Sequence, residues 1–383
     1  MKSTVLTLVV LIPAMVAWPQ AEQSVFDPET FFAPAGSAVD EAGETATLRA
    51  ASRTGLDFSG DAGADVLYTI LEPFDDDERT SVYTGATALR LDASGGDRKD
   101  AKVEASVLVR LGYGVAAAPV LSFELKKLYL SVYTPLADIS AGRMVINYGR
   151  GTIFSPVDLF SAVDTSDLGL GRAGTDALRV QVPFGDFSGL DLVATLGRST
   201  GDGIAGARVY GNVSGLDLGV SAFSDGLADG SGDLVAGLDF KGDLVLGISG
   251  EAVARVPLAD WQPDATGAVY SLMLGVDYSF AGEWFVDAEY LWNASAGDAV
   301  AAGSFSSGQN LSGSLSWKPD ELTALDLRCI MAPRENALQA TVSLSRSVAS
   351  GANLISYAQY QRGDVAGHST ESLGLGLRLS VAY

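Results

Sequence analysis

The final stretch of the chain, Ser372–Tyr383, carries the clearest pattern of hydrophobic and polar positions. Every odd position from Leu373 to Tyr383 is a large apolar residue, whereas every even position is small or polar. A period of two places the apolar side chains on one face of a β-strand. At about 3.3 Å per residue and a tilt of roughly 40°, the stretch would cover about 30 Å, enough for the apolar band of an outer-membrane barrel. The pattern therefore predicts a membrane-spanning strand.

The same alternation recurs along the chain from Tyr83 onward, with short polar turns between the segments. Clear examples are residues 103–111, 190–196, 272–280, 284–292, 311–317 and 338–344. We count about seventeen such segments, or eighteen if Thr45–Phe58 supplies a weak first strand. Because bacterial single-chain barrels have even strand numbers, we predict an all-β, antiparallel up-and-down transmembrane barrel of 16–18 strands, with 18 favoured. A water-soluble all-β protein is the alternative fold.

The N-terminal part of the chain predicts export and an acidic region ahead of the barrel. Lys2 precedes an apolar stretch that is too short to span a membrane as a helix, so residues 1–21 are expected to be a signal peptide. Residues 22–80 are rich in acids, and we expect either a periplasmic extension or a plug that enters the barrel. The barrel is then expected over residues 81–383.

Composition narrows the function classes. The net charge is −22, which argues against binding to nucleic acid. Cys329 is the only cysteine and His368 the only histidine, so a disulfide framework and a histidine-based metal cluster are excluded. Catalysis by His368 with its neighbour Ser369 is disfavoured because adjacent residues do not easily face each other. We therefore expect no enzymatic activity, no cofactor and no metal.

Aromatic residues gather at the ends of the apolar faces, where the interfacial girdles of a membrane barrel would lie. They are Tyr278, Phe280, Trp284, Trp292, Trp317 and Tyr383. A last strand that ends on an aromatic residue resembles the assembly signal of bacterial outer-membrane barrels. That resemblance implies that Tyr383 is the assembly signal and that the barrel-assembly machinery is a partner.

One region resembles a known family. Residues 141–151 read Ala-Gly-Arg-Met-Val-Ile-Asn-Tyr-Gly-Arg-Gly, residues 155–160 read Ser-Pro-Val-Asp-Leu-Phe, and residues 174–179 read Gly-Thr-Asp-Ala-Leu-Arg. The three motifs, in this order, are similar to those of alginate-export-type and related outer-membrane porins. Met144 and Tyr148 depart from the family pattern, where Gln and Trp are common. The resemblance covers about 60 residues and implies a porin-like barrel, without a substrate.

The connection within this region, residues 148–176, is far longer than a hairpin needs, and long loops are usually functional or disordered. Its apolar residues would be unfavourable in water, so we expect the loop to fold into the barrel; a surface loop is the alternative. The residues expected to form the constriction are Asn147, which would face the lumen, and the loop residues Arg150, Asp158, Asp164 and Arg172, which would be its polar contacts with the wall. Before it, alternation is expected to place Met144, Ile146 and Tyr148 toward lipid and Arg143 toward the lumen.

The charges expected to point inward divide along the chain. The first strands contribute bases, and strands between residues 215 and 290 contribute acids with no inward base. The basic set is Arg90, Arg110, Arg143, Arg179 and Arg208, and the acidic set is Asp217, Asp239, Glu251, Asp277, Asp287 and Glu289. The hypothesis is a pore with a basic wall facing an acidic wall across water.

These features together predict a porin in the bacterial outer membrane for passive diffusion of small hydrophilic solutes. Its expected partners are outer-membrane lipid, the assembly machinery and small polar solutes. Two alternatives remain open: an uptake channel for hydrophobic molecules, and a structural or adhesive surface barrel without transport. The sequence leaves open the solute and the oligomeric state.

Overall fold

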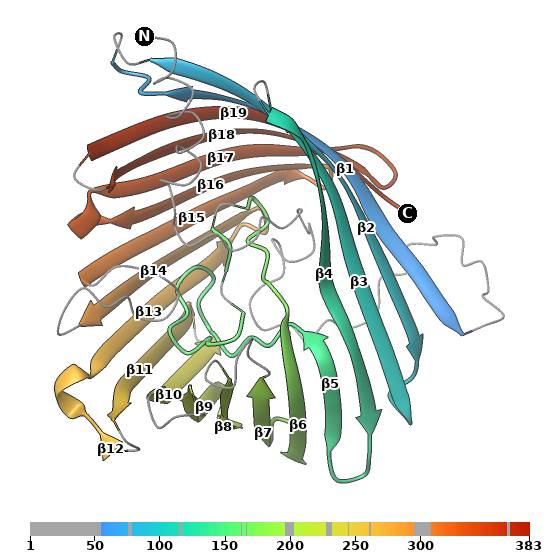
Figure 1. Ribbon diagram of the computed structural model, residues 1–383, viewed down its shortest axis with the longest axis vertical. Helices are drawn as coiled ribbons and strands as arrows, with labels where there is room; N and C mark the ends of the chain where they lie inside the picture. The colour runs from blue at the N-terminus through green and yellow to red at the C-terminus, as the bar shows by residue number, and fades with distance from the viewer. Residues whose placement is uncertain are drawn as a thin grey trace.

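The computed structural model describes residues 55–75, 79–114, 117–161, 163–165, 167–195, 203–226, 232–243, 245–259, 262–294, 308–365 and 368–383. These residues form a closed antiparallel barrel of eighteen long strands, with a two-residue strand, β12, added beside β11 (Figure 1). The prediction of an 18-stranded all-β barrel is confirmed.

The strands follow one another around the ring in chain order. Their bounds are β1 (Leu56–Leu71), β2 (Thr80–Gly96), β3 (Ala101–Gly114), β4 (Ala117–Tyr133), β5 (Asp138–Met144), β6 (Thr175–Gly185), β7 (Ser188–Thr195), β8 (Ile204–Val213), β9 (Leu216–Asp225), β10 (Gly232–Asp243), β11 (Gly247–Ala259), β12 (Gln262–Pro263), β13 (Val269–Phe280), β14 (Trp284–Ala294), β15 (Gly308–Asp320), β16 (Thr323–Ala332), β17 (Ala337–Ala349), β18 (Ala352–Val365) and β19 (His368–Ala382). Two single-turn 3-10 helices, η1 (Ala265–Gly267) and η3 (Pro333–Glu335), lie in connections. No helix in this part of the chain is long and apolar enough to cross a membrane.

The barrel closes between its first and last strands. β1 pairs with β2 on one side and with β19 on the other, over a register that runs from Asp61 opposite Ala382 to Leu71 opposite Ser372. After β19 ends, Tyr383 continues the pairing: its N–H donates to the Gly60 carbonyl at 3.0 Å, and the Gly60 N–H donates back at 3.2 Å. Closure leaves no free sheet edge along this seam, which is the arrangement that lipid requires.

Tight turns join the strands at the end of the barrel where Tyr383 lies. At Ser214–Gly215 and at Ala281–Gly282, both turn residues have positive φ, which matches the right-handed twist of two-residue hairpins. The connections at the other end include the stretch of 30 residues from 145 to 174. Since outer-membrane barrels have short periplasmic turns and longer extracellular loops, the Tyr383 end corresponds to the periplasmic side.

Side chains alternate between an apolar outer face and a more polar inner face. On β19, Leu375, Leu377 and Leu379 point outward, and cross-strand pairing puts Arg378 on the same face as the inward Asp65 of β1. Near the periplasmic end an outer row of rings stacks from β13 to β15, with centroids 5.9 Å apart for Phe280–Trp284 and 5.2 Å apart for Trp284–Trp317. This row lies where an interfacial aromatic girdle is expected.

The first strand differs from the sequence-based expectation. β1 spans Leu56–Leu71 rather than Thr45–Phe58, so the barrel begins inside the region assigned to an extension or plug, and before residue 81. The acids that made this region seem solvated, Asp57, Asp61 and Asp65, alternate with small residues and share the inner face of β1. The predicted signal peptide and residues up to 54 lie outside the described residues.

Candidate functional site: a loop fixed across the barrel lumen

The candidate site is built on the segment from Val145 to Gly174, called the lumen loop below. Met144, the last residue of β5, pairs directly with Thr175, the first residue of β6, so the loop leaves and re-enters the sheet at adjacent positions. Figure 1 shows the segment between β5 and β6 running across the space enclosed by the strands. The prediction that this loop folds inward is confirmed.

Apolar contacts hold the lumen loop against the inner wall in three places. Ile146, Tyr148 and Val157 pack with Phe223, Val235 and Val253 of β9–β11; Ile153 and Phe154 pack with Met273, Leu291 and Ile330 of β13, β14 and β16; Leu168 packs with Ile355 and Tyr357 of β18. The loop therefore crosses from one part of the wall to another rather than lying along a single strand. This packing removes the apolar residues of the loop from water, which stabilises the loop in its position inside the barrel.

Glu251 of β11 binds the backbone of the first half of the loop. One carboxylate oxygen accepts hydrogen bonds from the N–H groups of Arg150 and Gly151, and the other accepts one from the N–H of Val157 at 2.9 Å. Glu251 is 2% exposed. A buried carboxylate is tolerated when donors satisfy its oxygens, and here the loop supplies the donors.

Glu289 of β14 does the same for the next residues. Its oxygens accept hydrogen bonds from the N–H of Thr152, from that of Ile153 at 3.0 Å and from that of Phe154 at 2.8 Å. Two inward glutamates thus fix the backbone from Arg150 to Val157. Two side chains are enough because all the N–H donors belong to one short segment of backbone, residues 150–157.

The second half of the loop is held by hydrogen-bond donors of the wall rather than by acceptors. Arg328 of β16 donates to the carbonyl of Asp167 at 3.1 Å, and Gln339 of β17 donates to the carbonyl of Thr165 at 2.8 Å. The Asp167 carboxylate lies 3.6 Å from the guanidinium of Arg378 on β19. The wall therefore offers acceptors to the N–H groups of the first half and donors to the carbonyls of the second half.

A charged cluster supports the point where the loop enters the lumen. Arg150 of the loop and Arg208 of β8 both donate to the carboxylate of Asp239 on β10, each at 2.7 Å. The guanidinium groups of Arg208 and Arg179 lie 5.2 Å and 5.8 Å from the centroid of the Tyr148 ring. These cation–π contacts give a buried tyrosine two cationic neighbours and orient its ring.

Within the loop, Asp158 is paired with Arg172, which also donates to the Ser161 carbonyl at 2.7 Å. Burial raises the pKa of the Asp158 carboxyl to about 6, and Arg172 offsets part of that increase. The pair joins the middle of the loop to its C-terminal end, so Asp158 and Arg172 bond each other rather than the wall, contrary to the expectation from sequence.

The predicted basic residues occupy different surroundings. Arg90 lies on the inner face of β2 with its Nε 2.9 Å from Asp61 and 3.1 Å from Asp92, and Arg110 lies on the inner face of β3. Arg179 is bonded to Asp191 at 2.9 Å and, like Arg208, lies under the lumen loop. Most of the basic residues are therefore paired with carboxylates on the same or neighbouring strands, rather than facing the acidic residues across a water-filled pore.

The prediction that Arg143 faces the lumen is wrong. Arg143 lies on the outer face of β5, beside Leu128, and its guanidinium donates to the Asp176 carboxylate at 2.8 Å. Met144, Ile146 and Tyr148 point into the lumen rather than toward lipid. The alternation was read correctly but assigned to the wrong face, because the apolar face here meets a protein core inside the barrel. Glycine at position 142, with φ of 125°, approaches β4 too closely for any side chain.

The acidic set lies on the inner face, but most of it is covered rather than open to water. Glu251 and Glu289 are covered by the loop, Asp239 is buried between arginines, and Asp277 and Asp287 lie opposite each other on β13 and β14. Asp217 is half-exposed, with its carboxylate 3.9 Å from Arg150. The loop residue Asn147 accepts a hydrogen bond from the Gly149 N–H, and Asp164 is buried within the loop.

The expectation of no inward base between residues 215 and 290 is wrong. Lys241 of β10 lies on the inner face opposite Asp217, and Arg255 of β11 bonds Asp225 and Asp233 at 2.9 and 2.8 Å. Sequence analysis also missed Arg328, Gln339 and Arg378 as loop contacts. Alternation alone would have put all three on the inner face, but nothing in the sequence shows which inward residues meet the loop.

The fold is that of a bacterial outer-membrane β-barrel channel: eighteen strands, an apolar exterior and a loop fixed inside. Among solved structures, the chain is similar to the outer-membrane channels OccAB4 of Acinetobacter baumannii (TM-score 0.55, 9% identity, 85% of this chain and 98% of that one) and OccK5 (OpdH) of Pseudomonas aeruginosa (0.57, 10%, 85% and 98%). OccK11 (OpdR) of the same organism matches similarly (0.56, 10%, 85% and 96%).

At such identities these likenesses show the fold alone. No protein-family model matches the sequence, and no curated protein matches it. The resemblance to alginate-export-type porins is not specifically supported, whereas the broader likeness to outer-membrane channels is.

Proposed function

We propose that this protein is an outer-membrane porin for passive diffusion of small hydrophilic solutes, with the lumen loop as its constriction. The observation that carries the proposal is the position of the loop. It is anchored to β11 and β14 and, in a ring of eighteen strands, these lie opposite β2–β4. The solute path would then run between the loop and the inner face of β2–β4.

The inner face of that opposite wall is charged and partly exposed, which favours polar solutes. Lys102 and Glu104 lie 2.7 Å apart on β3, with side chains 32% and 26% exposed, and Arg90 lies between two aspartates on β1 and β2. Closely spaced charges of both signs keep water in a channel and penalise apolar molecules. A channel for hydrophobic molecules would need an apolar path here instead.

The test is single-channel conductance of the purified protein in a planar bilayer. In the diagnostic variant, residues 145–174 are replaced by a short Gly-Ser turn, which can join Met144 to Thr175 because these two residues are paired neighbours. We expect the intact protein to conduct and the variant to conduct several-fold more. No conductance by either protein would favour a structural or adhesive barrel, and equal conductance would place the constriction elsewhere.

Two further parts of the proposal concern the chain ends. Residues 1–21 would direct export and be removed, and Tyr383 would be recognised by the barrel-assembly machinery. Both are supported by sequence: a short apolar stretch after Lys2, and an outward aromatic ring at the last position.

A further inference from the structure

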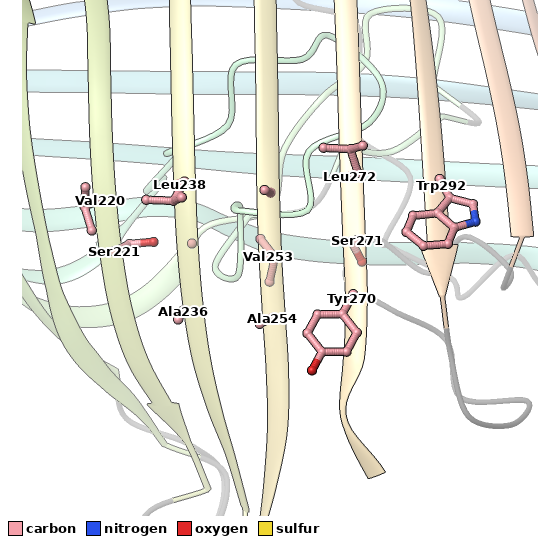
Figure 2. A pocket seen from close by; sticks show the side chains of 12 residues that line it. Val220, Ser221, Ala236, Leu238, Val253, Ala254, Tyr270, Ser271, Leu272 and Trp292 are labelled. Carbon is pink, nitrogen blue, oxygen red and sulfur yellow. The ribbon is translucent and has the colours of Figure 1, made fainter. Parts of the chain in front are cut away.

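The outer surface of the barrel contains an apolar groove that crosses β9, β10, β11, β13 and β14 (Figure 2). Its volume is about 520 Å³, within the roughly 300–1,000 Å³ range of small-molecule pockets. It opens on the outer face, because eight of its twelve lining residues point outward; the other four, Ser221, Gly237, Val253 and Ser271, are the inward residues between them on the same strands.

The groove exists because small residues cluster on adjacent strands. Ala236 of β10 pairs with Ala254 of β11, and Ala252 pairs with Leu238 on one side and Leu272 on the other. Three alanines therefore form a floor between large residues. The rim residues protrude: Val220 is 56% exposed and Leu238 57%, with Tyr270, Leu272 and Trp292 also exposed.

The groove lies in the extracellular half of the barrel wall. Tyr270 is the second residue of β13, and Trp292 is close to the end of β14, both at the end opposite the periplasmic turns. In Figure 2 the Tyr270 hydroxyl points toward these strand ends, beyond the level of Ala254. Cross-strand pairing puts Tyr270 level with Ala254 and Trp292 level with Leu272 and Ala252, so the two aromatic residues flank the apolar recess, as residues near a membrane interface do.

We propose that this groove binds one acyl chain of an outer-leaflet lipid. The strands that form it span the membrane, so only hydrocarbon or another protein can cover it. The side chains that line it carry no charge, and Tyr270 places a hydroxyl on the side of the strand ends, where a headgroup linkage would sit. Rim residues on both sides of a recessed floor fit a single acyl chain. A lipid bound in this way would stay longer than the lipids around the rest of the barrel.

The groove also lies directly behind an anchor of the lumen loop. Gly237 faces inward between Ala236 and Leu238, and a Cβ at this glycine would come within 3.4 Å of Val157 of the loop. Val253, between Ala252 and Ala254, packs against the same loop region on the inside. One layer of backbone therefore separates the proposed lipid from the constriction.

The test uses the full-length folded protein in detergent, titrated with purified lipid A and observed by native mass spectrometry. The double variant Ala252→Leu with Ala254→Leu fills the floor. The matched control is Ala340→Leu, which adds the same side chain to the outer face of β17. Both variants are first checked for resistance to unfolding in SDS at room temperature.

We expect the wild type and the control to retain one lipid, and the affinity of the double variant to fall about tenfold, as expected when roughly two methylenes lose their burial. Equal retention by all three proteins, or no retained lipid in the wild type, would overturn the proposal. So would a wild-type dimer that the double variant abolishes, since the groove would then be covered by a second copy of the chain.

Discussion

At the residue scale, two glutamate side chains accept the backbone hydrogen bonds that a neighbouring strand would accept in a hairpin. Glu251 and Glu289 satisfy consecutive N–H groups of a loop that has no strand partner. An unsatisfied buried N–H costs about 1–3 kcal/mol, so each glutamate replaces several such penalties with charge-assisted hydrogen bonds. The glutamates are also buried only because the loop covers them.

This mutual dependence gives a test with Glu289→Gln. The amide keeps the shape of the side chain but replaces one acceptor oxygen with a donor that faces the loop N–H groups. We expect the free energy of unfolding to fall by about 3 kcal/mol, and the conductance to become larger and noisier as the loop loosens. Denaturant titration and bilayer recordings measure the two effects.

Glu104→Gln is the matched control, because Glu104 lies on the inner face of β3 and pairs with a half-exposed Lys102. Partly exposed pairs of this kind contribute about 0–1 kcal/mol, so the free energy of unfolding is expected to change little; the comparison is confined to that quantity because Glu104 lies on the proposed solute path. If both variants lose the same free energy of unfolding, the hydrogen bonds from the loop to Glu289 do not determine the position of the loop.

Asp158 makes docking of the loop sensitive to pH. A carboxyl whose pKa is about 6 in the docked loop and near 3.8 when released binds its proton more readily when docked. Docking is therefore favoured as pH falls from about 6 to about 4, and this contribution is lost as pH rises through that range.

The prediction is a difference between wild type and Asp158→Asn. Hydrogen exchange of the backbone around residues 155–161 should slow more in the wild type than in the variant when pH is lowered from 6 to 4, after correction for intrinsic exchange. The difference isolates Asp158 from other carboxylates that respond to the same change. Identical pH dependence in the two proteins would show that Asp158 is not linked to docking.

At the scale of elements, the success of sequence analysis depended on what each strand face meets. β19 was predicted with its faces assigned correctly, because its outer face meets lipid and its inner face is small or polar. β5 was assigned to the wrong face because both faces meet apolar surroundings, lipid outside and the lumen loop inside. β1 was misplaced because its small residues weaken the alternation.

The loop shows a similar limit. Its length and apolar content predicted that it folds inward, but the partners of its backbone could not be predicted. Glu251 and Glu289 were expected to line an open pore, since a period of two places a side chain inside without saying what covers it. Arg328 and Arg378 hold the loop through distances of more than 150 residues in sequence, which local pattern does not encode.

The last strand supports a prediction about assembly. The Tyr383 backbone pairs with Gly60, whereas its ring is 60% exposed and its hydroxyl only reaches the Arg90 carbonyl at 3.3 Å. Tyr383→Ser keeps the backbone pairing and removes the ring. We expect strongly reduced barrel levels in the outer membrane with little change in the unfolding midpoint of the protein that does fold.

Tyr278→Ser is the control, since Tyr278 is another outward tyrosine, on β13 of the same barrel. Normal outer-membrane levels of the Tyr383 variant, or equal losses in both variants, would mean that the terminal ring is not an assembly signal. Membrane fractionation and immunoblotting supply the measurement.

At the scale of the whole molecule, the barrel is asymmetric inside and nearly uniform outside. The lumen loop contacts strands from β6 round to β19, and the inner face of β2 and β3 carries partly exposed charges. Solved Occ channels that share only about a tenth of their residues with this chain have a similar barrel. A similar barrel at so low an identity indicates that alternation, turn chemistry and strand number determine the shell, with few constraints on the identity of individual residues.

The pairing of β1 with β19 also has a consequence for biosynthesis. Because Asp61 pairs with Ala382, the seam between β1 and β19 can form only after nearly the entire polypeptide has been made. Contacts of such large sequence separation also slow folding. A chain interrupted by a premature stop would carry two unpaired strands, β1 and its last complete strand, each able to pair with another molecule. Ribosomal errors in this protein would accordingly yield aggregating fragments for proteases in the periplasm to degrade, rather than smaller working barrels.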